Sequence, residues 1–184
     1  MATTDVRLQD AAGRLERKPV VNDMSIQVAT VNGSGSQSSN TVLLRSIFQM
    51  GVPVSGKNMF PSNIAGLPTW YTIRANKNGY IGRKKEIDFL VAMNPETAQE
   101  DTLSLAPGAS VLYDEPLALH KLRDDLIFYS VPYDKLVAAV CPEAKLRKLV
   151  KNMVYVGVVA KLLQQSGERV AVSAEDAELE GVLP

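Results

Sequence analysis

A glycine- and serine-rich stretch, residues 32–40, has the composition best suited to ligand binding. It reads Asn-Gly-Ser-Gly-Ser-Gln-Ser-Ser-Asn, and its two glycines allow a tight turn and a close approach of a ligand to the backbone. A helix that begins here would add unpaired N–H groups and a partial positive charge, which favour a phosphate or carboxylate. We therefore predict a cofactor-binding loop formed by Asn32, Gly33, Ser34, Gly35, Ser36, Gln37 and Ser38.

The motif alone does not identify one ligand. The dinucleotide fingerprint Gly-x-Gly-x-x-Gly has Ser38 at its third glycine, and the phosphate loop of nucleotide triphosphatases needs a Gly-Lys-Ser/Thr ending that this loop lacks. A standard NAD site also needs an acidic residue about 20 positions after the glycines. Residues 53–55 (Pro-Val-Ser) stand there, which disfavours an NAD-type dehydrogenase. A tight strand-to-helix turn with serine caps is an alternative that the motif leaves open.

The distribution of charge favours an anionic ligand near this loop. The chain has 20 basic and 20 acidic residues, so its net charge indicates neither a nucleic-acid nor a membrane partner. Between Asp23 and Glu86, however, there is no acidic residue. The same interval holds seven bases, namely Arg45, Lys57, Arg74, Lys77, Arg83, Lys84 and Lys85. We expect these bases to create a positive region around the loop.

The single cysteine and single histidine limit the chemistry of the chain itself. Cys141 has no partner for an internal disulfide, which suits a reducing, cytoplasmic location. One cysteine and one histidine also give no metal constellation, and no pair of carboxylates resembles an acid–base couple. We expect His120 on the surface of a helix and Cys141 buried at a helix start. The sequence therefore predicts no catalytic residue and no metal site.

The elements around the loop predict an α/β domain. An apolar run over residues 26–31 precedes the loop as a strand, and a helical pattern over residues 43–50 follows it. A long structured loop is expected over residues 57–71. Further strands are predicted at residues 52–55, 71–74, 80–83, 87–93, 110–113 and 125–131, and helices after Asn94, before Cys141 and over residues 142–163. Residues 71–74 and 80–83 should form a β-hairpin through the Asn78-Gly79 turn.

These elements predict one three-layer, Rossmann-like α/β fold with a mostly parallel sheet and an added β-hairpin. Residues 24–163 should form the domain. Residues 1–23 are interpreted as a polar lead-in, and residues 164–184 as a polar, acidic tail. No apolar run is long enough to span a membrane.

Three segments of the sequence resemble a known enzyme family. Residues 31–38 (Val-Asn-Gly-Ser-Gly-Ser-Gln-Ser), 51–58 and 60–74 are similar to the γ-type domain of 2-oxoacid:ferredoxin oxidoreductases. They resemble more closely the N-terminal part of the 2-oxoglutarate:ferredoxin oxidoreductase α subunit. The wider family usually has Gly-x-Gly-Gly-Gln-Gly in the first loop, where this chain has Ser36 and Ser38. This departure argues against a positive φ at those two positions and fits the 2-oxoglutarate type better.

The resemblance implies a role in a larger enzyme. The family oxidises a 2-oxoacid with coenzyme A, using thiamine diphosphate and iron–sulfur clusters, and passes electrons to ferredoxin. By this resemblance the domain helps bind coenzyme A and assemble subunits, and Lys57 and Asn63 join the cofactor-binding residues. The Tyr-Pro-Ile-Thr-Pro motif of the thiamine domain and the cluster cysteines are absent from the chain. Expected partners are therefore a thiamine-binding domain or subunit, a β subunit and, through the complex, ferredoxin.

Several alternatives stay open at this point. The chain fits a truncated subunit, a separate γ-like subunit or a subunit with an altered terminus. A non-catalytic nucleotide- or coenzyme A-binding interaction module is the competing functional class. For the enzyme component, the apolar face of residues 153–163 and the loop at residues 60–71 are expected to lie against other domains.

Overall fold

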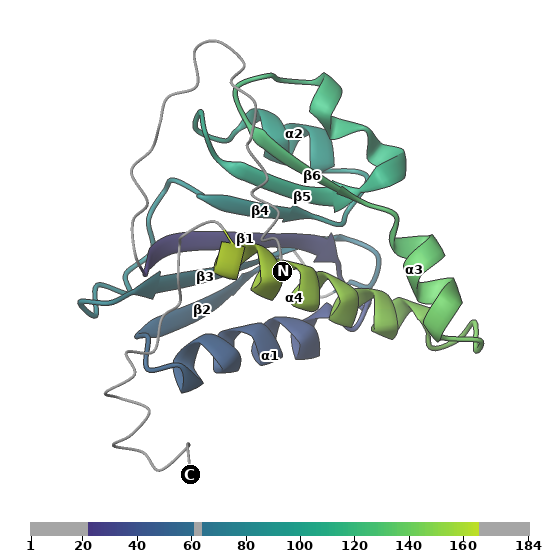
Figure 1. The fold of residues 1–184 in the computed structure, drawn as a ribbon, viewed down its shortest axis with the longest axis horizontal. Coiled ribbons are helices and arrows are strands. Elements are labelled where there is room, and N and C mark those ends of the chain that lie inside the picture. The colour runs from purple at the N-terminus through teal and green to yellow at the C-terminus, as the bar shows by residue number, and fades with distance from the viewer. Residues whose placement is uncertain (1–21, 61–63, 166–184) are drawn as a thin grey trace, which may run out of the picture.

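The computed structural model describes residues 22–60 and 64–165 of the 184-residue chain. Most of the predicted lead-in and tail, and the predicted ligand Asn63, lie outside the described residues. Six strands form one sheet in the order β2-β3-β1-β4-β5-β6 (Figure 1). The strands are β1 (Asp23–Val31), β2 (Val54–Met59), β3 (Pro68–Asn76), β4 (Phe89–Ala92), β5 (Ser110–Asp114) and β6 (Ile127–Val131). The helices are α1 (Ser36–Gln49), α2 (Ala98–Leu103), α3 (Tyr133–Val140) and α4 (Arg147–Gln165), with 3₁₀ turns η1 (Glu115–Leu117) and η2 (Leu119–Lys121).

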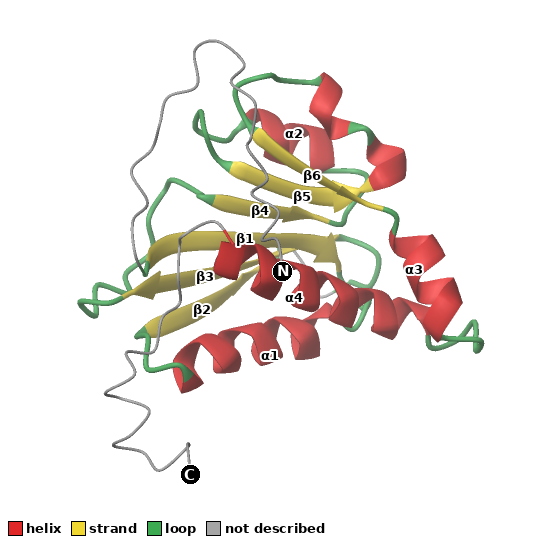
Figure 2. Cartoon of the chain, in the orientation of Figure 1, coloured by secondary structure: helices red, strands yellow, loops and turns green. Residues whose placement is uncertain are grey.

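The sheet is mostly parallel, as predicted. β1, β4, β5 and β6 pair in parallel, whereas β3 runs antiparallel to both β1 and β2. The helices cover both faces of the sheet, with α1 and α4 over one face and α2 behind the other (Figure 2). This arrangement is the three-layer α/β fold that the sequence predicts.

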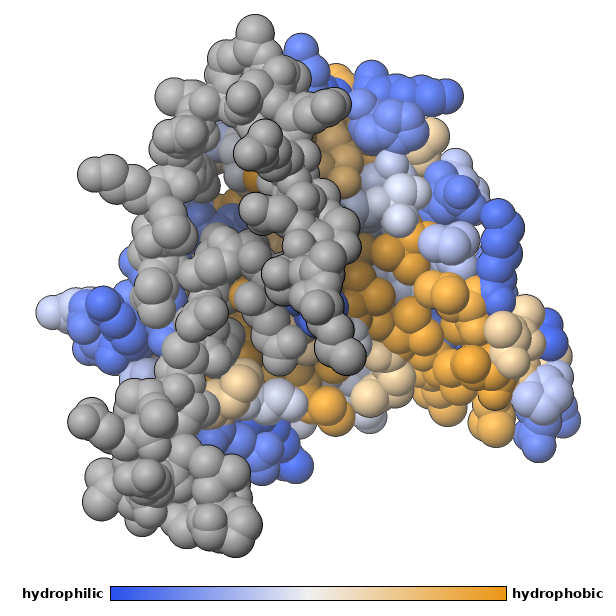
Figure 3. Space-filling view, in the orientation of Figure 1, coloured by the Kyte–Doolittle hydropathy of each residue, from blue (hydrophilic) through white to orange (hydrophobic). Residues whose placement is uncertain are grey.

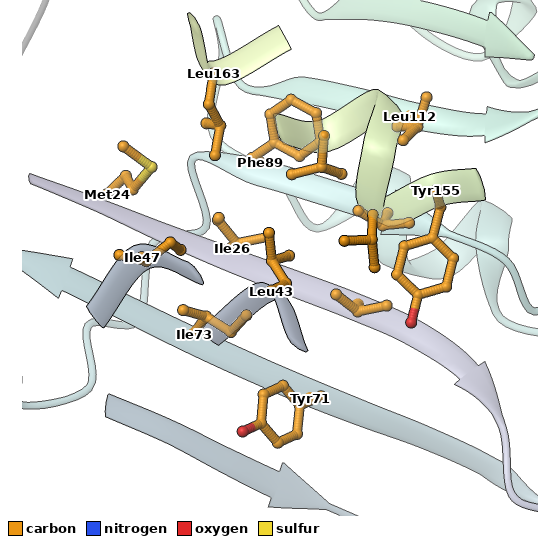
Figure 4. Close-up of a cluster of buried hydrophobic side chains, with 14 of the residues drawn as sticks. Met24, Ile26, Leu43, Ile47, Tyr71, Ile73, Phe89, Leu112, Tyr155 and Leu163 are labelled. Carbon is orange, nitrogen blue, oxygen red and sulfur yellow. The ribbon is translucent and has the colours of Figure 1, made fainter. Parts of the chain in front are cut away.

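β1 lies in the middle of the sheet and buries residues on both of its faces, although Ser25 and Gln27 on the α2 side are polar. Met24, Ile26 and Val28 point into the core under α1 and α4, and Ala29 belongs to the core on the α2 side. Figure 4 shows the first core, in which Leu43 of α1 and Tyr155 of α4 approach the strands. The face under α1 and α4 therefore accounts for most of the apolar residues that mark this strand in the sequence.

The predicted hairpin has a different partner in the structure. β3 contains residues 71–74 but pairs with β2, so the hairpin joins β2 to β3. Residues 80–83 form no strand, because Asn76 Oδ1 accepts hydrogen bonds from the backbone N–H groups of Asn78 and Tyr80 and turns the chain away. The long loop predicted over residues 57–71 is correspondingly shorter, since strands occupy both of its ends.

The predicted start of the last helix is also wrong. Cys141 is extended, residues 144–146 form a turn, and α4 begins at Arg147. The second half of α4 buries one face through Tyr155, Val159 and Leu163, whereas the sequence predicted burial nearly all round. Asn94 does not cap α2 directly either, because it caps a preceding turn by accepting a bond from the Glu96 N–H.

The predicted partner surface is confirmed in one part and shifted in the other: Phe60, Ile64 and Leu67 of the predicted loop are exposed, but the exposed apolar residues near α4 lie closer to α3 than predicted. Apolar side chains gather over α3 and the first half of α4 (Figure 3). This α3–α4 apolar face consists of Leu136, Val140, Leu146, Leu149 and Met153. Of these five side chains, Met153 alone belongs to the face that was predicted to contact other domains.

Candidate functional site

The predicted loop connects the carboxyl end of β1 to the start of α1. Gly33 and Gly35 have φ angles of 81° and 80°, a left-handed region that side chains with a Cβ rarely adopt. Ser36 and Ser38 lie within α1, so the serines at the family's glycine positions require no positive φ. In this loop the chain therefore has glycine at the two positions where the backbone adopts a positive φ, Gly33 and Gly35.

Within the described part of the chain, no side chain caps the N-terminus of α1. Gly35 is the N-cap residue, no described side chain hydrogen-bonds to the free N–H groups, and the first turn has no acidic residue. Ser36 and Ser39 are not capping residues, because their hydroxyl groups contact Thr30 Oγ1 at 2.9 Å and Met153 Sδ at 3.4 Å. The serine-cap interpretation is therefore wrong, and the helix start keeps donors for a ligand.

α4 fixes the loop from one side through two buried polar residues. Asn152 Nδ2 donates to the Ser34 carbonyl at 2.8 Å, and the Tyr155 hydroxyl donates to Asn40 Oδ1 at 2.7 Å. Burial raises the pKa of Tyr155, so its hydroxyl stays protonated and remains a donor at neutral pH. These bonds connect residues that are more than a hundred positions apart.

Asn32 fixes the loop from the other side. Its backbone N–H donates to the Leu67 carbonyl at 2.8 Å, and its Nδ2 donates to the Ile64 carbonyl at 2.9 Å. In return the Gly66 N–H donates to the Asn32 carbonyl at 3.0 Å. The segment before β3 therefore forms part of the site wall.

A first cleft of about 790 Å³ opens beside the loop, between the strand ends, α3 and α4. Thr30 and Met93, at the ends of β1 and β4, line its base. α1 follows β1 on one face and α2 follows β4 on the other, so this is the place where ligands bind in open α/β sheets. Its basic residues come from α4, namely Arg147, Lys148 and Lys151.

The three basic residues of the first cleft differ in their free charge. Lys151 Nζ lies 2.6 Å from Asp114 Oδ2 and 3.1 Å from Asp134 Oδ1, so two carboxylates more than neutralise it, and Asp134 itself lines the cleft. Burial lowers the pKa of Lys151, but the bonds to these two carboxylates outweigh it and raise the pKa. Arg147 Nε donates to the Cys141 carbonyl at 3.1 Å, and no carboxylate in the described part of the chain pairs with its guanidinium group. Among the described residues Lys148 has no carboxylate partner, so Arg147 and Lys148 are available to an anion.

A second cleft of about 390 Å³ lies on the other side of the loop, against the β2–β3 hairpin. Gln37 and Asn58 face each other there, with Asn58 Nδ2 donating to Gln37 Oε1 at 2.6 Å. Phe60 and Tyr71 add aromatic surface, and Asn32 contributes to both clefts. None of the described residues that line this cleft is charged.

The structure brings most of the predicted site residues together. Those that line at least one cleft are Asn32, Gly33, Ser34, Gly35, Ser36 and Gln37. Ser38 and Lys57 line neither. Lys57 is paired with Thr72, next to the Asn58–Tyr71 pair, so it points to the sheet face opposite α1.

The predicted source of positive charge is wrong. Arg74 is buried at the opposite end of β1, where it forms an ion pair with Asp23, and Lys84 also lies 3.6 Å from Asp23. The bases beside the loop come instead from α4, about 110 residues later in the sequence. The sequence signal for them, Lys-Leu-Arg-Lys before an apolar helix, was present but gave no spatial link to the loop.

The remaining candidate residues take structural roles. His120 is exposed on η2, with Nδ1 2.7 Å from the Tyr113 hydroxyl, and Cys141 is buried at the end of α3. Within residues 22–60 and 64–165 no group of three or more His, Cys, Asp or Glu side chains could hold a metal ion. In the same part of the chain, no helix combines the length and apolar character needed to cross a membrane.

Comparison with known proteins places this chain in a family. The family model described as pyruvate ferredoxin/flavodoxin oxidoreductase matches residues 25–177. Subunit alpha of 2-oxoacid:ferredoxin oxidoreductase 2 from Aeropyrum pernix is 25% identical over 92 residues, which is 50% of this chain. The match covers 14% of that relative, so this chain corresponds to a small part of it.

Three solved structures share the fold. A 2-oxoglutarate:ferredoxin oxidoreductase from Magnetococcus marinus, with 2-oxoglutarate, coenzyme A and succinyl-CoA bound, superposes with a TM-score of 0.61 at 20% identity. The match covers 88% of this chain and 31% of that one. A pyruvate oxidoreductase subunit from Thermotoga maritima has a TM-score of 0.61 at 13% identity, covering 89% and 86% of the two chains. The γ subunit of a keto/oxoacid ferredoxin oxidoreductase from Geobacter sulfurreducens PCA has a TM-score of 0.59 at 17% identity. The match covers 88% of this chain and 87% of that one.

Proposed function

Because the chain belongs to the pyruvate ferredoxin/flavodoxin oxidoreductase family, we propose that it is a component of a cytoplasmic 2-oxoacid:ferredoxin oxidoreductase. In the proposed reaction a 2-oxoacid loses CO₂, its acyl group is transferred to coenzyme A, and two electrons pass to ferredoxin. The role of this domain is to bind coenzyme A and to hold the subunits together. We propose 2-oxoglutarate as the substrate.

One observation carries the coenzyme A proposal, namely the charge pattern of the first cleft. Within the described residues, Arg147 and Lys148 have no carboxylate partner beside the loop at Gly33, while Asp134 of the same cleft pairs with Lys151. No side chain of the described residues caps the N-terminus of α1 at Gly35. Coenzyme A carries several phosphate charges, which such a region attracts. The coenzyme A bound to the Magnetococcus marinus relative supports the same interpretation.

The choice of 2-oxoglutarate has separate support. It rests on the likeness to the 2-oxoglutarate enzyme from Magnetococcus marinus and on the serines at positions 36 and 38. The residues of this chain surround the proposed coenzyme A site, so 2-oxoacid selection is assigned to another domain.

Thiamine diphosphate and the iron–sulfur clusters are proposed to reside elsewhere in the complex. A cluster is held by several cysteine thiolates, and this chain has one cysteine, which is buried beside a helix end. The residues present therefore do not fit a cluster. Because the cofactors are proposed to lie on other parts of the complex, we propose that the chain forms a hetero-oligomer. The α3–α4 apolar face is the proposed contact surface.

The test is to purify the complex through an affinity tag on this chain and to measure viologen reduction. We expect reduction that requires both coenzyme A and a 2-oxoacid, with 2-oxoglutarate preferred over pyruvate. A complex that turns over pyruvate better would contradict the substrate assignment alone. If the purified material binds coenzyme A but oxidises no 2-oxoacid, the chain is a non-catalytic binding module and the enzyme proposal fails.

A further inference from the structure

A basic loop, residues 77–85, follows β3 on the way to β4 and projects from the sheet at the left edge of Figure 1. It begins after Asn76, which pairs with Asp23 at the start of β1, whereas the glycine-rich loop follows the end of β1 at Val31. The basic loop therefore lies at the opposite end of the sheet from both clefts, and the proposed function gives it no role.

Three bases of this loop have no carboxylate partner among the described residues. The four bases of the loop are Lys77, Arg83, Lys84 and Lys85. Lys84 pairs at the base of the loop, where its Nζ lies 3.6 Å from Asp23 Oδ1 and 3.9 Å from Asp88 Oδ2. The other three bases are exposed, and so is Glu86, which directly follows the loop. Three bases against one exposed acid leave a surplus of two positive charges at the surface.

Two exposed apolar side chains lie between these bases in the sequence. Tyr80 is 74% exposed, the highest exposed fraction of any large apolar side chain in the described part of the chain, and Ile81 is 37% exposed. A single exposed apolar side chain is ordinary. Tyrosine together with arginine, however, is the composition typical of the energetic centre of a protein interface. The loop therefore combines an apolar contact with positive charge.

Hydrogen bonds hold the loop in a defined conformation. Asn76 Oδ1 accepts bonds from the N–H groups of Asn78 and Tyr80, and the Gly79 N–H donates to the Asn76 carbonyl at 3.0 Å. Ser55 Oγ, on the edge strand β2, donates to the Ile81 carbonyl at 2.6 Å. A loop that is already ordered loses less conformational entropy when a partner binds.

We infer that the basic loop is a docking surface for an acidic segment of a partner protein, separate from the α3–α4 apolar face. Carboxylates of the partner pair with the three exposed bases, and an apolar side chain of the partner packs on Tyr80. A short acidic segment fits better than a nucleic acid, because Glu86, Asp23 and Asp88 border the loop and would repel an extended phosphate backbone. Since the contact depends on surface charge, it is sensitive to salt and suits a partner that binds transiently.

The test is an NMR titration of the ¹⁵N-labelled full chain with the acidic peptide acetyl-Glu-Glu-Leu-Glu-Glu-amide. A second peptide, in which glutamine replaces every glutamate, is the neutral control. We expect the acidic peptide to shift the amide resonances of residues 77–85 at low salt, and about 300 mM salt to abolish these shifts. The neutral peptide should shift none of them.

Matched variants separate the loop from general surface charge. The charge variant carries Lys77→Gln, Arg83→Gln and Lys85→Gln, and its control carries three substitutions at exposed bases outside the loop, Arg45→Gln, Lys121→Gln and Lys145→Gln. We expect the charge variant to weaken peptide binding about tenfold and the control to leave it unchanged. Tyr80→Ser should weaken binding about threefold, whereas Phe48→Ser, at a ring that is 66% exposed, should have no effect.

The substituted side chains are all exposed, so the dispersion of the amide spectrum should be unchanged in every variant. The docking surface is refuted if the acidic peptide shifts no amide of the loop, if the neutral peptide binds equally well, or if the control variant weakens binding as much as the charge variant. Tighter binding of an oligothymidine to the same residues at the same salt would also overturn it, in favour of a nucleic acid. None of these results would affect the proposed coenzyme A function, because the first cleft lies at the other end of the sheet.

Discussion

Gly35→Ala should destabilise the chain more than another glycine substitution at the same backbone angle. Gly35 and Gly51 have nearly equal φ angles, 80° and 77°. A Cβ at Gly35 would collide with the Leu149 side chain, whereas a Cβ at Gly51 would meet nothing within 4 Å. The pair therefore separates the cost of the backbone conformation from the cost of the collision.

The magnitudes follow from these surroundings. A left-handed conformation costs a residue with a Cβ about 1–2 kcal/mol, and both variants incur this cost. Leu149 is 51% exposed, so it can turn away from a new Cβ at Gly35. Leaving its rotamer and part of its burial costs about 1–2 kcal/mol more. We expect Gly35→Ala to cost about 3 kcal/mol and Gly51→Ala about 1.5 kcal/mol.

Urea unfolding followed by the fluorescence of the single tryptophan, Trp70, measures these free energies. In a Leu149→Ala background the extra cost of Gly35→Ala should disappear, while the cost of Gly51→Ala should not change. Equal costs for the two glycines, or a Gly35→Ala cost that Leu149→Ala does not reduce, would refute the proposed packing of the loop under α4.

Three further predictions concern the polar contacts and the activity. Tyr155→Phe leaves the buried Asn40 Oδ1 without its donor and should lower the free energy of unfolding by about 1–2 kcal/mol, measured by urea titration. Burial raises the pKa of Asp23, but bonds from Asn76 and Arg74 outweigh it and hold the pKa below the ordinary 3.8. The stabilisation by Asp23 is therefore present above about pH 4 and is lost as the pH falls through the lower pKa of the folded state. In unfolding experiments from pH 2 to 5, the stability of Asp23→Asn should depend less steeply on pH than that of the unmodified chain. An unchanged pH dependence would contradict this prediction. The purified chain alone should not reduce viologen with 2-oxoglutarate and coenzyme A, and any such activity would contradict the assignment of thiamine and cluster chemistry to other parts of the complex.

The fold could be predicted from the sequence where local patterns determine it. The apolar run of β1, the glycines of the loop and the helical pattern of α1 each depend on neighbouring residues. β2 was predicted less well, because Val54–Met59 is an edge strand whose polar residues show little alternation. β2 pairs with β3 through backbone hydrogen bonds, which do not require particular residue types, so the sequence does not reveal this pairing.

The site could be predicted in part for the same reason. The loop residues that line the clefts are adjacent in the sequence, so their composition indicated a ligand. Asn152 and the bases Arg147 and Lys148 reach the loop because α4 packs beside α1, and the sequence does not reveal this long-range contact. The charge counted along the chain therefore indicated Arg74 and Lys84, which lie near Asp23 at the opposite end of β1.

The proposed function requires this domain to bind coenzyme A through the first cleft. The most direct test is the KM for coenzyme A in the assembled complex carrying Lys148→Gln, with Lys145→Gln as the matched control and 2-oxoacid decarboxylation measured separately. We expect Lys148→Gln alone to raise the KM for coenzyme A about tenfold and to leave decarboxylation unchanged. An unchanged KM, or an equal loss of both half-reactions, would contradict it.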